Sequence, residues 1–221
     1  MTELEALKQR HSVRAYLDKE IESEKQQLLK TRVAAVNAES GLNIQVFFND
    51  PDCFDTNRAD YGIFKNCKNY FVMIAKKGRD EDIGYFGQSL VLYAQSLGLN
   101  TCWAKMSYKK GSVQGEIKDG EKRYIVVALG YGETQGNERK TKPANKLSNI
   151  SDNSPEWFKN GVEAAMLAPT AVNQQAFYLK QEGNTVKAKT TLGLGALTKM
   201  DLGIVKYNFE VAAGKENFKW A

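Results

Sequence analysis

Two short apolar runs constrain the fold of this chain more than any other feature. The runs are 69–75 (NYFVMIA) and 124–130 (YIVVALG), and each has a length that suits a strand buried on both faces. Between them, apolar residues recur at helical spacing over 83–97, and Gly98 ends the pattern. The sequence therefore predicts a buried sheet with a mostly buried helix against it.

The remaining segments mix helices and strands without strict alternation. Helices are expected over 2–10, from Ile21 to about residue 37, from Ser154-Pro155 to about Leu167, and over 201–213. In the second of these helices, the apolar face is formed by Leu28, Leu29, Val33 and Val36. Strands are expected over 43–48, 175–181 and 185–190, the last two joined as a hairpin by Glu182-Gly183-Asn184. Residues 131–153 are polar and are expected to form a loop. This order predicts an α+β fold rather than a doubly wound sheet.

Composition excludes several classes of function. The only histidine among the 221 residues is His11, so a metal site built from two or three histidines of one chain is excluded. Cys53, Cys67 and Cys102 form no CxxC pair, which favours free, buried thiols and a cytoplasmic location. The net charge of +5 is mild and predicts no nucleic-acid partner. No apolar run approaches the roughly 20 residues of a membrane span, and the charged N-terminus is no secretory signal.

Two parts of the sequence resemble each other. Residues 42–45 (LNIQ) parallel 172–175 (VNQQ), and 82–84 (DIG) parallel 201–203 (DLG), at offsets of 130 and 119 residues. Short matches of this kind arise by chance. The shared order of elements around them nevertheless favours a diverged internal duplication.

The strongest local motif is Arg10-His11-Ser12-Val13-Arg14, at the expected end of the first helix. Two guanidinium groups, a hydroxyl and an imidazole come together there. Such a donor set suits a phosphate monoester dianion, which accepts bidentate charged hydrogen bonds. The alternative is a solvated basic turn near the N-terminus.

Five segments of the sequence resemble the nitroreductase superfamily of FMN-dependent oxidoreductases. They are the Arg-x-Ser-x-Arg-x-aromatic signature over 10–16, GLNTCW over 98–103, the strand YIVVALGY over 124–131, the basic segment KTKP over 140–143, and APTAVNQQ over 168–175. In the family the last signature normally follows the first by roughly thirty residues, where this chain has the degraded NAESGLNIQ over 37–45. The intact copy lies far downstream, in the second of the two sequence parts that resemble each other.

The resemblance implies a nitroreductase-like fold, with a mixed or antiparallel sheet flanked by helices. Members of the family are usually intertwined homodimers that hold FMN at the subunit interface. The displaced signature indicates a fused pseudo-dimer in which 1–150 carries the phosphate site and 151–221 is a diverged second half replacing the partner. One compact unit with one FMN, and a monomer rather than a homodimer, are therefore expected.

The resemblance also assigns the cofactor-binding residues. The phosphate would be held by Arg10, His11, Ser12 and Arg14, and from the other side by Lys140 and Lys142, with Arg139 as an alternative in that loop. Pro169, Thr170 and Asn173 would line the isoalloxazine, and Trp103, Ala104 and Lys105 would lie near flavin N5. Tyr61-Gly62 would offer backbone to the pyrimidine ring or form only a tight turn. A charged solvated loop is the alternative for Lys140 and Lys142, and a helix C-terminus ending in proline is the alternative for Pro169 to Asn173. Cys102 is expected to be a packed thiol rather than a redox group.

The activity implied is that of an NAD(P)H-dependent oxidoreductase. NADH or NADPH would reduce FMN, and the flavin would pass the hydride to a nitroaromatic, a quinone or a similar small acceptor. No side chain is expected to be catalytic, because the flavin carries the reaction. The alternative is a flavin-binding storage or sensor protein without turnover. A relative without flavin, acting as an interaction module, is a third reading. No metal and no membrane partner are expected.

Overall fold

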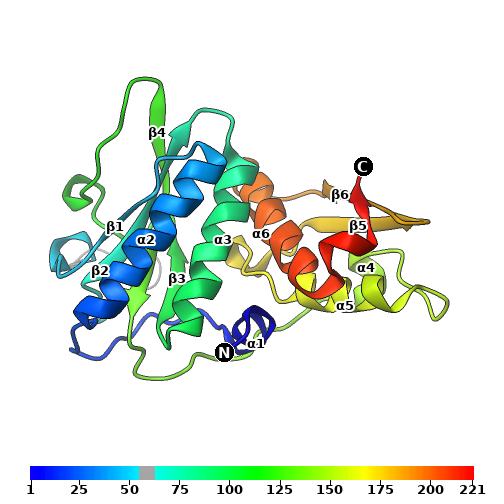
Figure 1. Ribbon diagram of the computed structural model, residues 1–221, viewed down its shortest axis with the longest axis horizontal. Helices are drawn as coiled ribbons and strands as arrows, with labels where there is room; N and C mark the ends of the chain where they lie inside the picture. The colour runs from blue at the N-terminus through cyan, green and yellow to red at the C-terminus, as the bar shows by residue number, and fades with distance from the viewer. Residues whose placement is uncertain (55–62) are drawn as a thin grey trace. The chain divides into compact units, whose positions relative to one another are not determined.

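The computed structural model describes residues 1–54 and 63–221 (Figure 1), so Tyr61 and Gly62 lie outside the described residues. The chain forms two compact units. The first comprises Met1, Gln9–Arg79 and Leu90–Glu138, and the second comprises Thr2–Lys8, Asp80–Ser89 and Arg139–Ala221. Both units combine helices with sheet, which confirms the predicted α+β class. Among the described residues, no helix is both long and apolar enough to cross a membrane.

A four-stranded antiparallel sheet forms the centre of the first unit, in the order β1-β2-β4-β3. Its strands are β1 (Gln45–Phe47), β2 (Asn69–Lys76), β3 (Asn100–Ala104) and β4 (Glu121–Gly130). The two apolar runs of the sequence are β2 and β4, paired so that Phe71 lies opposite Val127. Both strands are buried on both faces where they pair, as continuous apolar runs require.

Two helices lie over one face of this sheet (Figure 1). They are α2 (Ser23–Ser40) and the later part of α3 (Asp80–Ser96), and the Arg32 guanidinium of α2 lies 5.8 Å from the Tyr93 ring centroid of α3. Helix α2 buries Leu29, Val33 and Val36. Leu28, however, is 40% exposed, so the prediction that it faces the core is wrong. It lies one residue before Leu29, a step that rotates a helical side chain away from the buried face.

A hydrophobic cluster of the first unit joins strand residues with residues of the segments between the regular elements. It contains Val13, Tyr16, Cys53, Phe54, Phe64, Cys67, Tyr70, Val72, Ile74, Cys102, Ala104, Tyr108, Val126 and Ala128. All three cysteines are buried there as free thiols, which confirms that prediction. Burial raises the pKa of the Cys53 thiol to about 12, so this thiol is inert at neutral pH.

The second unit packs helices against a smaller sheet. Its helices are α1 (Glu3–Gln9), α4 (Ala144–Leu147), α5 (Glu156–Met166) and α6 (Ala196–Ala213), together with the first part of α3. Its strands are β5 (Phe177–Glu182), β6 (Thr185–Thr190) and β7 (Lys219–Trp220). Strands β5 and β6 form the predicted hairpin, with Gly183 at φ 57°, whereas β7 runs parallel to β6.

Helices α3 and α6 cross at two glycines. A Cβ on Gly84 would lie 1.9 Å from the Met200 carbonyl oxygen, and one on Gly203 would lie 1.9 Å from the Glu81 carbonyl oxygen. Only glycine permits backbones to approach this closely. Farther along the same helices, the Gln88 amide donates to Asn208 Oδ1 at 2.9 Å in the interior.

Several boundaries differ from the sequence-based expectations. No strand was predicted over 100–104, yet these residues form β3, an edge strand of the first unit's sheet. Helix α5 begins at Glu156 rather than at Pro155, and the Ser154 hydroxyl accepts the Ser151 N–H instead of capping the helix. Helix α6 begins at Ala196, before the expected 201, and the predicted loop over 131–153 contains the short helix α4.

Candidate functional site

In the first unit, the basic motif runs alongside strand β3. Ser12 forms a parallel bridge with Thr101, and the Val13 N–H donates to the Thr101 carbonyl at 3.1 Å. This pairing fixes the backbone between the two arginines. Arg10 is 6% exposed, whereas Arg14 is exposed and forms no ion pair with any residue in 1–54 or 63–221.

A glycine-containing turn backs this motif. A Cβ on Gly136, which has φ 81°, would lie 2.6 Å from His11 Cβ and 3.1 Å from the Ser12 carbonyl oxygen. The turn is held by Asn100, whose side-chain oxygen accepts the Gly132 N–H at 3.0 Å. The His11 ring donates from Nδ1 to the Gln9 carbonyl at 3.1 Å. The motif and the turn therefore form a close-packed cradle that larger residues would fill.

The charged groups around Cys102 make the electrostatic potential in this cradle positive. Burial raises the pKa of the Cys102 thiol, while Arg14, the Ser12 hydroxyl and Arg10 each lower it. Both guanidinium groups and the hydroxyl therefore act on one point in the middle of β3. Two arginines, a hydroxyl and a glycine turn are a donor set that fits a phosphate monoester.

The other predicted residues of the first unit lie at the far end of β3. Ala104 is buried on the strand, and the Trp103 indole Nε1 is buried without a hydrogen-bond partner among the described residues. The Lys105 ammonium donates to the backbone carbonyl of Tyr124. Trp103 therefore has a buried N–H donor without a partner among the described residues, on the strand that runs alongside the basic motif.

In the second unit, the segment after α5 forms a strained turn. Val172, Asn173 and Gln175 have positive φ angles of 46°, 55° and 45°. Each such residue costs about 1–3 kcal/mol, and the β-branched Val172 is the most unusual of the three. Strain of this kind persists only where surrounding contacts fix the backbone.

The basic loop supplies some of these contacts. The Lys142 ammonium donates to the carbonyls of Gln174 at 2.8 Å and Gln175 at 3.3 Å. The Asn173 amide donates to the Lys140 carbonyl at 2.8 Å, and the Thr170 hydroxyl accepts the Gln175 N–H at 3.1 Å. The structure therefore brings Lys140, Lys142, Thr170 and Asn173 together, directly after Pro169.

Arg139, the alternative basic residue, is anchored to a helix end. Its guanidinium donates to the Met166 carbonyl at 2.6 Å, its Nε is buried without a partner among the described residues, and burial lowers its pKa.

The predicted site residues are divided between the two units. The first unit contains Arg10, His11, Ser12, Arg14, Trp103, Ala104 and Lys105, and the second contains Lys140, Lys142, Pro169, Thr170 and Asn173. Their predicted roles toward a cofactor stay predictions. In the described part of the chain, no three histidine, cysteine or acidic residues gather as a metal site.

Comparison with known proteins places the chain in a family. The model of the family described as "Putative TM nitroreductase" matches residues 3–213. The chain belongs to this family. No curated protein matches the sequence. The signatures over 10–16 and 168–175 both lie within the matched residues.

Solved structures share this fold at low sequence identity. A protein described as a putative nitroreductase from Thermotoga maritima is 22% identical with a TM-score of 0.66, over 96% of this chain and 83% of that chain. A putative nitroreductase from Desulfovibrio desulfuricans, in complex with FMN, is 18% identical with a TM-score of 0.51, over 70% of this chain and 99% of that chain. A putative NADH dehydrogenase/NAD(P)H nitroreductase from Bacteroides thetaiotaomicron is 19% identical with a TM-score of 0.52, over 69% and 98%. At these identities the likeness concerns the fold.

One buried acid in the second unit of this nitroreductase-family protein was missed by sequence reasoning. Asp201, 7% exposed on α6, accepts the Ala171 N–H with both carboxylate oxygens, at 3.1 and 3.0 Å, and the Gln174 amide at 2.6 Å. Burial raises the pKa of Asp201 from its ordinary 3.8 to about 6, although these hydrogen bonds lower it. The only sequence signal was the repeated Asp-x-Gly at 82 and 201.

The raised pKa predicts a pH-dependent stability. Because the folded protein keeps the Asp201 proton to a higher pH than the unfolded chain, the stabilisation is full below about pH 3.8 and is lost as the pH rises through about 6. The gap corresponds to about 3 kcal/mol. Denaturant unfolding of the wild type and Asp201→Asn from pH 4 to 7 should show the wild type losing stability relative to the variant. A constant difference would contradict the raised pKa.

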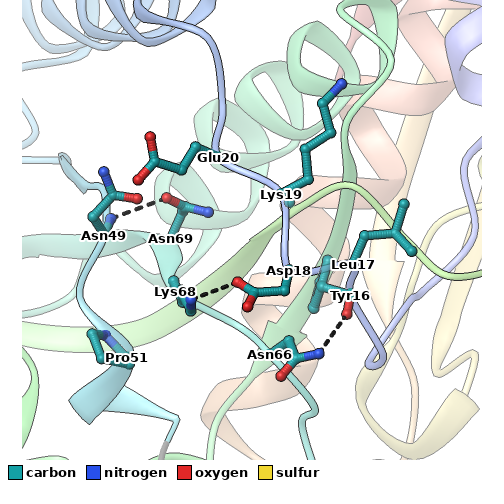
Figure 2. A pocket seen from close by; sticks show the side chains of 11 residues that line it. Tyr16, Leu17, Asp18, Lys19, Glu20, Asn49, Pro51, Asn66, Lys68 and Asn69 are labelled. Atoms are coloured by element: carbon teal, nitrogen blue, oxygen red, sulfur yellow. Dashed lines mark hydrogen bonds and ion pairs between the residues drawn. The ribbon is translucent and has the colours of Figure 1, made fainter.

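A cavity of about 240 Å³ lies elsewhere in the first unit (Figure 2). It is lined by Tyr16, Leu17, Asp18, Lys19, Glu20, Asn49, Pro51, Asn66, Lys68, Asn69 and Gly130, none of which is a predicted site residue. Its polar groups largely satisfy one another, since Lys68 pairs with Asp18 at 2.6 Å and the Asn66 amide donates to the Tyr16 carbonyl at 3.2 Å. The Lys19 side chain points away from that ion pair (Figure 2). The cavity therefore gives no indication of a particular ligand.

Proposed function

We propose that this protein is an FMN-dependent oxidoreductase of the nitroreductase type, which takes a hydride from NADH or NADPH and passes it to a small electron-poor acceptor such as a nitroaromatic or a quinone. The observation that carries the proposal is the cradle of Arg10, Ser12 and Arg14 beside the glycine turn, in a chain that belongs to a nitroreductase family. The FMN complex of the Desulfovibrio protein of similar fold supports the choice of cofactor.

FMN, when bound, supplies the hydride chemistry, and this chain's residues bind and orient it. Arg10, Ser12 and Arg14 would hold the phosphate through charged and neutral hydrogen bonds. The end of β3, with Trp103 and Lys105, would face the ring system. In the second unit, the strained turn from Pro169 to Asn173 would line the isoalloxazine, and the basic loop that packs against the turn would keep its shape.

We also propose one flavin site per chain, built from a duplicated unit. The element order α2-β1-β2-α3-β3 parallels α5-β5-β6-α6-β7. Strands β1 and β2 pair antiparallel, as do β5 and β6. Strand β3 runs parallel to β2 with β4 between them, whereas β7 pairs directly with β6 in parallel. This pattern supports a second copy that has lost the strand corresponding to β4.

The helix crossing of the second unit supports the same relationship. Gly84 meets the carbonyl of Met200, and Gly203 meets the carbonyl of Glu81, so each glycine meets the residue three positions before the other. A reciprocal contact of this kind is the mark of a local two-fold axis. The offset between the glycines, 119 residues, equals that of the repeated Asp-x-Gly. Because the phosphate motif occurs only once, the chain would hold one FMN and work as a monomer.

The cofactor and the activity are tested on the purified full chain. We expect yellow protein, or protein that FMN turns yellow, with one FMN per chain by absorbance and protein concentration. Anaerobic NADH or NADPH should bleach the flavin bands, and a nitroaromatic or quinone should restore them. Size-exclusion chromatography with light scattering should give the mass of one chain.

Each outcome decides between named functions. Protein that cannot be loaded with FMN would overturn the proposal. FMN-loaded protein that neither NADH nor NADPH bleaches, although dithionite does, would instead support a flavin store or sensor without turnover. Two FMN molecules per chain would contradict the single site.

A further inference from the structure

The strained turn over 170–175 is fixed from two sides. On one side, the Lys142 ammonium binds the carbonyls of Gln174 and Gln175. On the other, the carboxylate of Asp201 binds the N–H of Ala171 and the amide of Gln174. A cation thus satisfies carbonyl oxygens while an anion satisfies N–H donors, and both are charge-assisted hydrogen bonds.

The contacts of Asp201 extend to a second segment through Gln174. The Gln174 amide nitrogen donates to Asp201 Oδ2, and its amide oxygen accepts the Leu194 N–H at 2.9 Å. Gly193 lies beside this group, because a Cβ there would lie 2.6 Å from Gln174 Oε1. Asp201 therefore fixes the turn directly and the loop before α6 indirectly.

We propose that Asp201 is a positioning residue for FMN: its carboxylate holds the turn over 170–175 in the strained conformation that the flavin site uses. The inference rests on the proposed function, because it takes this turn as the flavin wall. Asp201 itself touches the turn, not the flavin. The ligand of the site is a flavin, and Asp201 controls the affinity of the protein for that flavin.

The hydrogen-bond pattern requires the ionised carboxylate. Two N–H donors, the Ala171 backbone N–H and the Gln174 side-chain amide, bind the Asp201 oxygens, and the Ala171 N–H is shared between both oxygens, so a proton on either oxygen weakens an acceptor that the turn uses. The pKa of Asp201 is raised to about 6 by burial and lowered by Gln174 and Ala171. The charged groups on its own helix and on the elements packed against it are Lys199, Lys206 and Glu210 on α6, Asp80, Glu81 and Asp82 on α3, Glu156, Lys159 and Glu163 on α5, Lys180 and Glu182 on β5, Lys187 and Lys189 on β6, and Lys215 and Glu216 directly after α6, with Lys142 across the turn. None of them is among the causes of this shift.

The test compares FMN affinity in the wild type and Asp201→Asn as a function of pH, by quenching of flavin fluorescence. At pH 8 we expect the variant to bind FMN at least about tenfold more weakly, since asparagine loses the negative charge and replaces one of the two accepting oxygens with an N–H donor. At pH 5 the wild-type carboxyl is itself mostly protonated, so the ratio should fall to about twofold or less. The FMN phosphate titrates identically with both proteins, and the ratio of dissociation constants removes its contribution.

Glu210→Gln is the matched control, because Glu210 is also an acid on α6, is 9% exposed, and binds Tyr85 and Trp220 rather than the turn. It should lower stability but keep the wild-type FMN affinity at both pH values.

If Asp201→Asn does not fold, Gln174→Leu removes the same bridge and should weaken FMN binding at pH 8. An equal loss in the Glu210 variant, a pH-independent ratio, or a folded variant with wild-type affinity would overturn the inference. Wild-type protein that binds no FMN would instead overturn the proposed function.

Discussion

Replacing Gly203 with alanine is expected to destabilise the protein by about 3 kcal/mol. The new Cβ would lie 1.9 Å from the Glu81 carbonyl oxygen and 2.7 Å from the Tyr85 backbone nitrogen, and both are backbone atoms of α3. In an unobstructed helix the same change would stabilise by about 1 kcal/mol, because alanine is the better helix former. The steric effect therefore decides the sign of the change in stability, since α3 and α6 must move apart to accept one methyl group.

Thermal and denaturant unfolding of the variant measure this effect. Gly84→Ala should destabilise by a similar amount, because its Cβ would meet the Met200 carbonyl oxygen at 1.9 Å. The double variant should lose less than the two single losses combined, since separated helices accommodate both methyl groups. Gly111→Ala, where no atom lies within 4 Å of the new Cβ, is the control and should melt like the wild type. A wild-type melting temperature for Gly203→Ala would contradict the close crossing.

The sequence predicted the elements with a regular apolar pattern, whether continuous, as in β2 and β4, or alternating, as in the hairpin of β5 and β6. Strands β2 and β4 were evident because a strand buried on both faces must be a continuous apolar run. Strand β3 was missed because it is only five residues long and opens with the polar Asn100 and Thr101. Asn100 is buried, and its side-chain oxygen accepts the N–H of Gly132, which is 32 residues away in the sequence. A short linear pattern does not reveal a contact of that kind.

The candidate site divides along a similar line. The resemblance identified the segments that contain Arg10 to Arg14 and Pro169 to Asn173, because those residues recur as short linear patterns. The resemblance also named Lys142, but as a phosphate ligand and not as a partner of the turn. In the structure Asp201 and Lys142 bind backbone groups of the turn, and backbone N–H and carbonyl groups are the same in every residue. No linear pattern can therefore predict such partners. The positive φ of Val172 was equally hidden, since a β-branched residue normally avoids that conformation.

Replacing Arg14 with alanine should weaken FMN binding about 10- to 100-fold and leave the fold intact. The expected loss is that of one charge-assisted hydrogen bond to phosphate, about 1.5–3 kcal/mol. The melting temperature should stay at its wild-type value, because the Arg14 side chain is exposed and forms no ion pair in the described part of the chain. Arg10→Ala should weaken FMN binding as well, but Arg10 is 6% exposed, so its variant also loses stability. Arg14 is therefore the cleaner test of the phosphate site.

Riboflavin separates a phosphate contact from a ring contact, because it lacks only the phosphate of FMN. If Arg14 holds the phosphate, Arg14→Ala should lower FMN affinity, leave riboflavin affinity unchanged and so reduce the preference for FMN. Arg14→Lys should recover part of that preference, since lysine keeps the charge but cannot bind two phosphate oxygens through one planar group. Lys77→Ala, an exposed cation in the turn after β2, changes net charge equally and should bind both ligands as the wild type does. Equal losses for riboflavin and FMN in Arg14→Ala would assign Arg14 to the flavin ring, whereas no loss for either would remove Arg14 from the site.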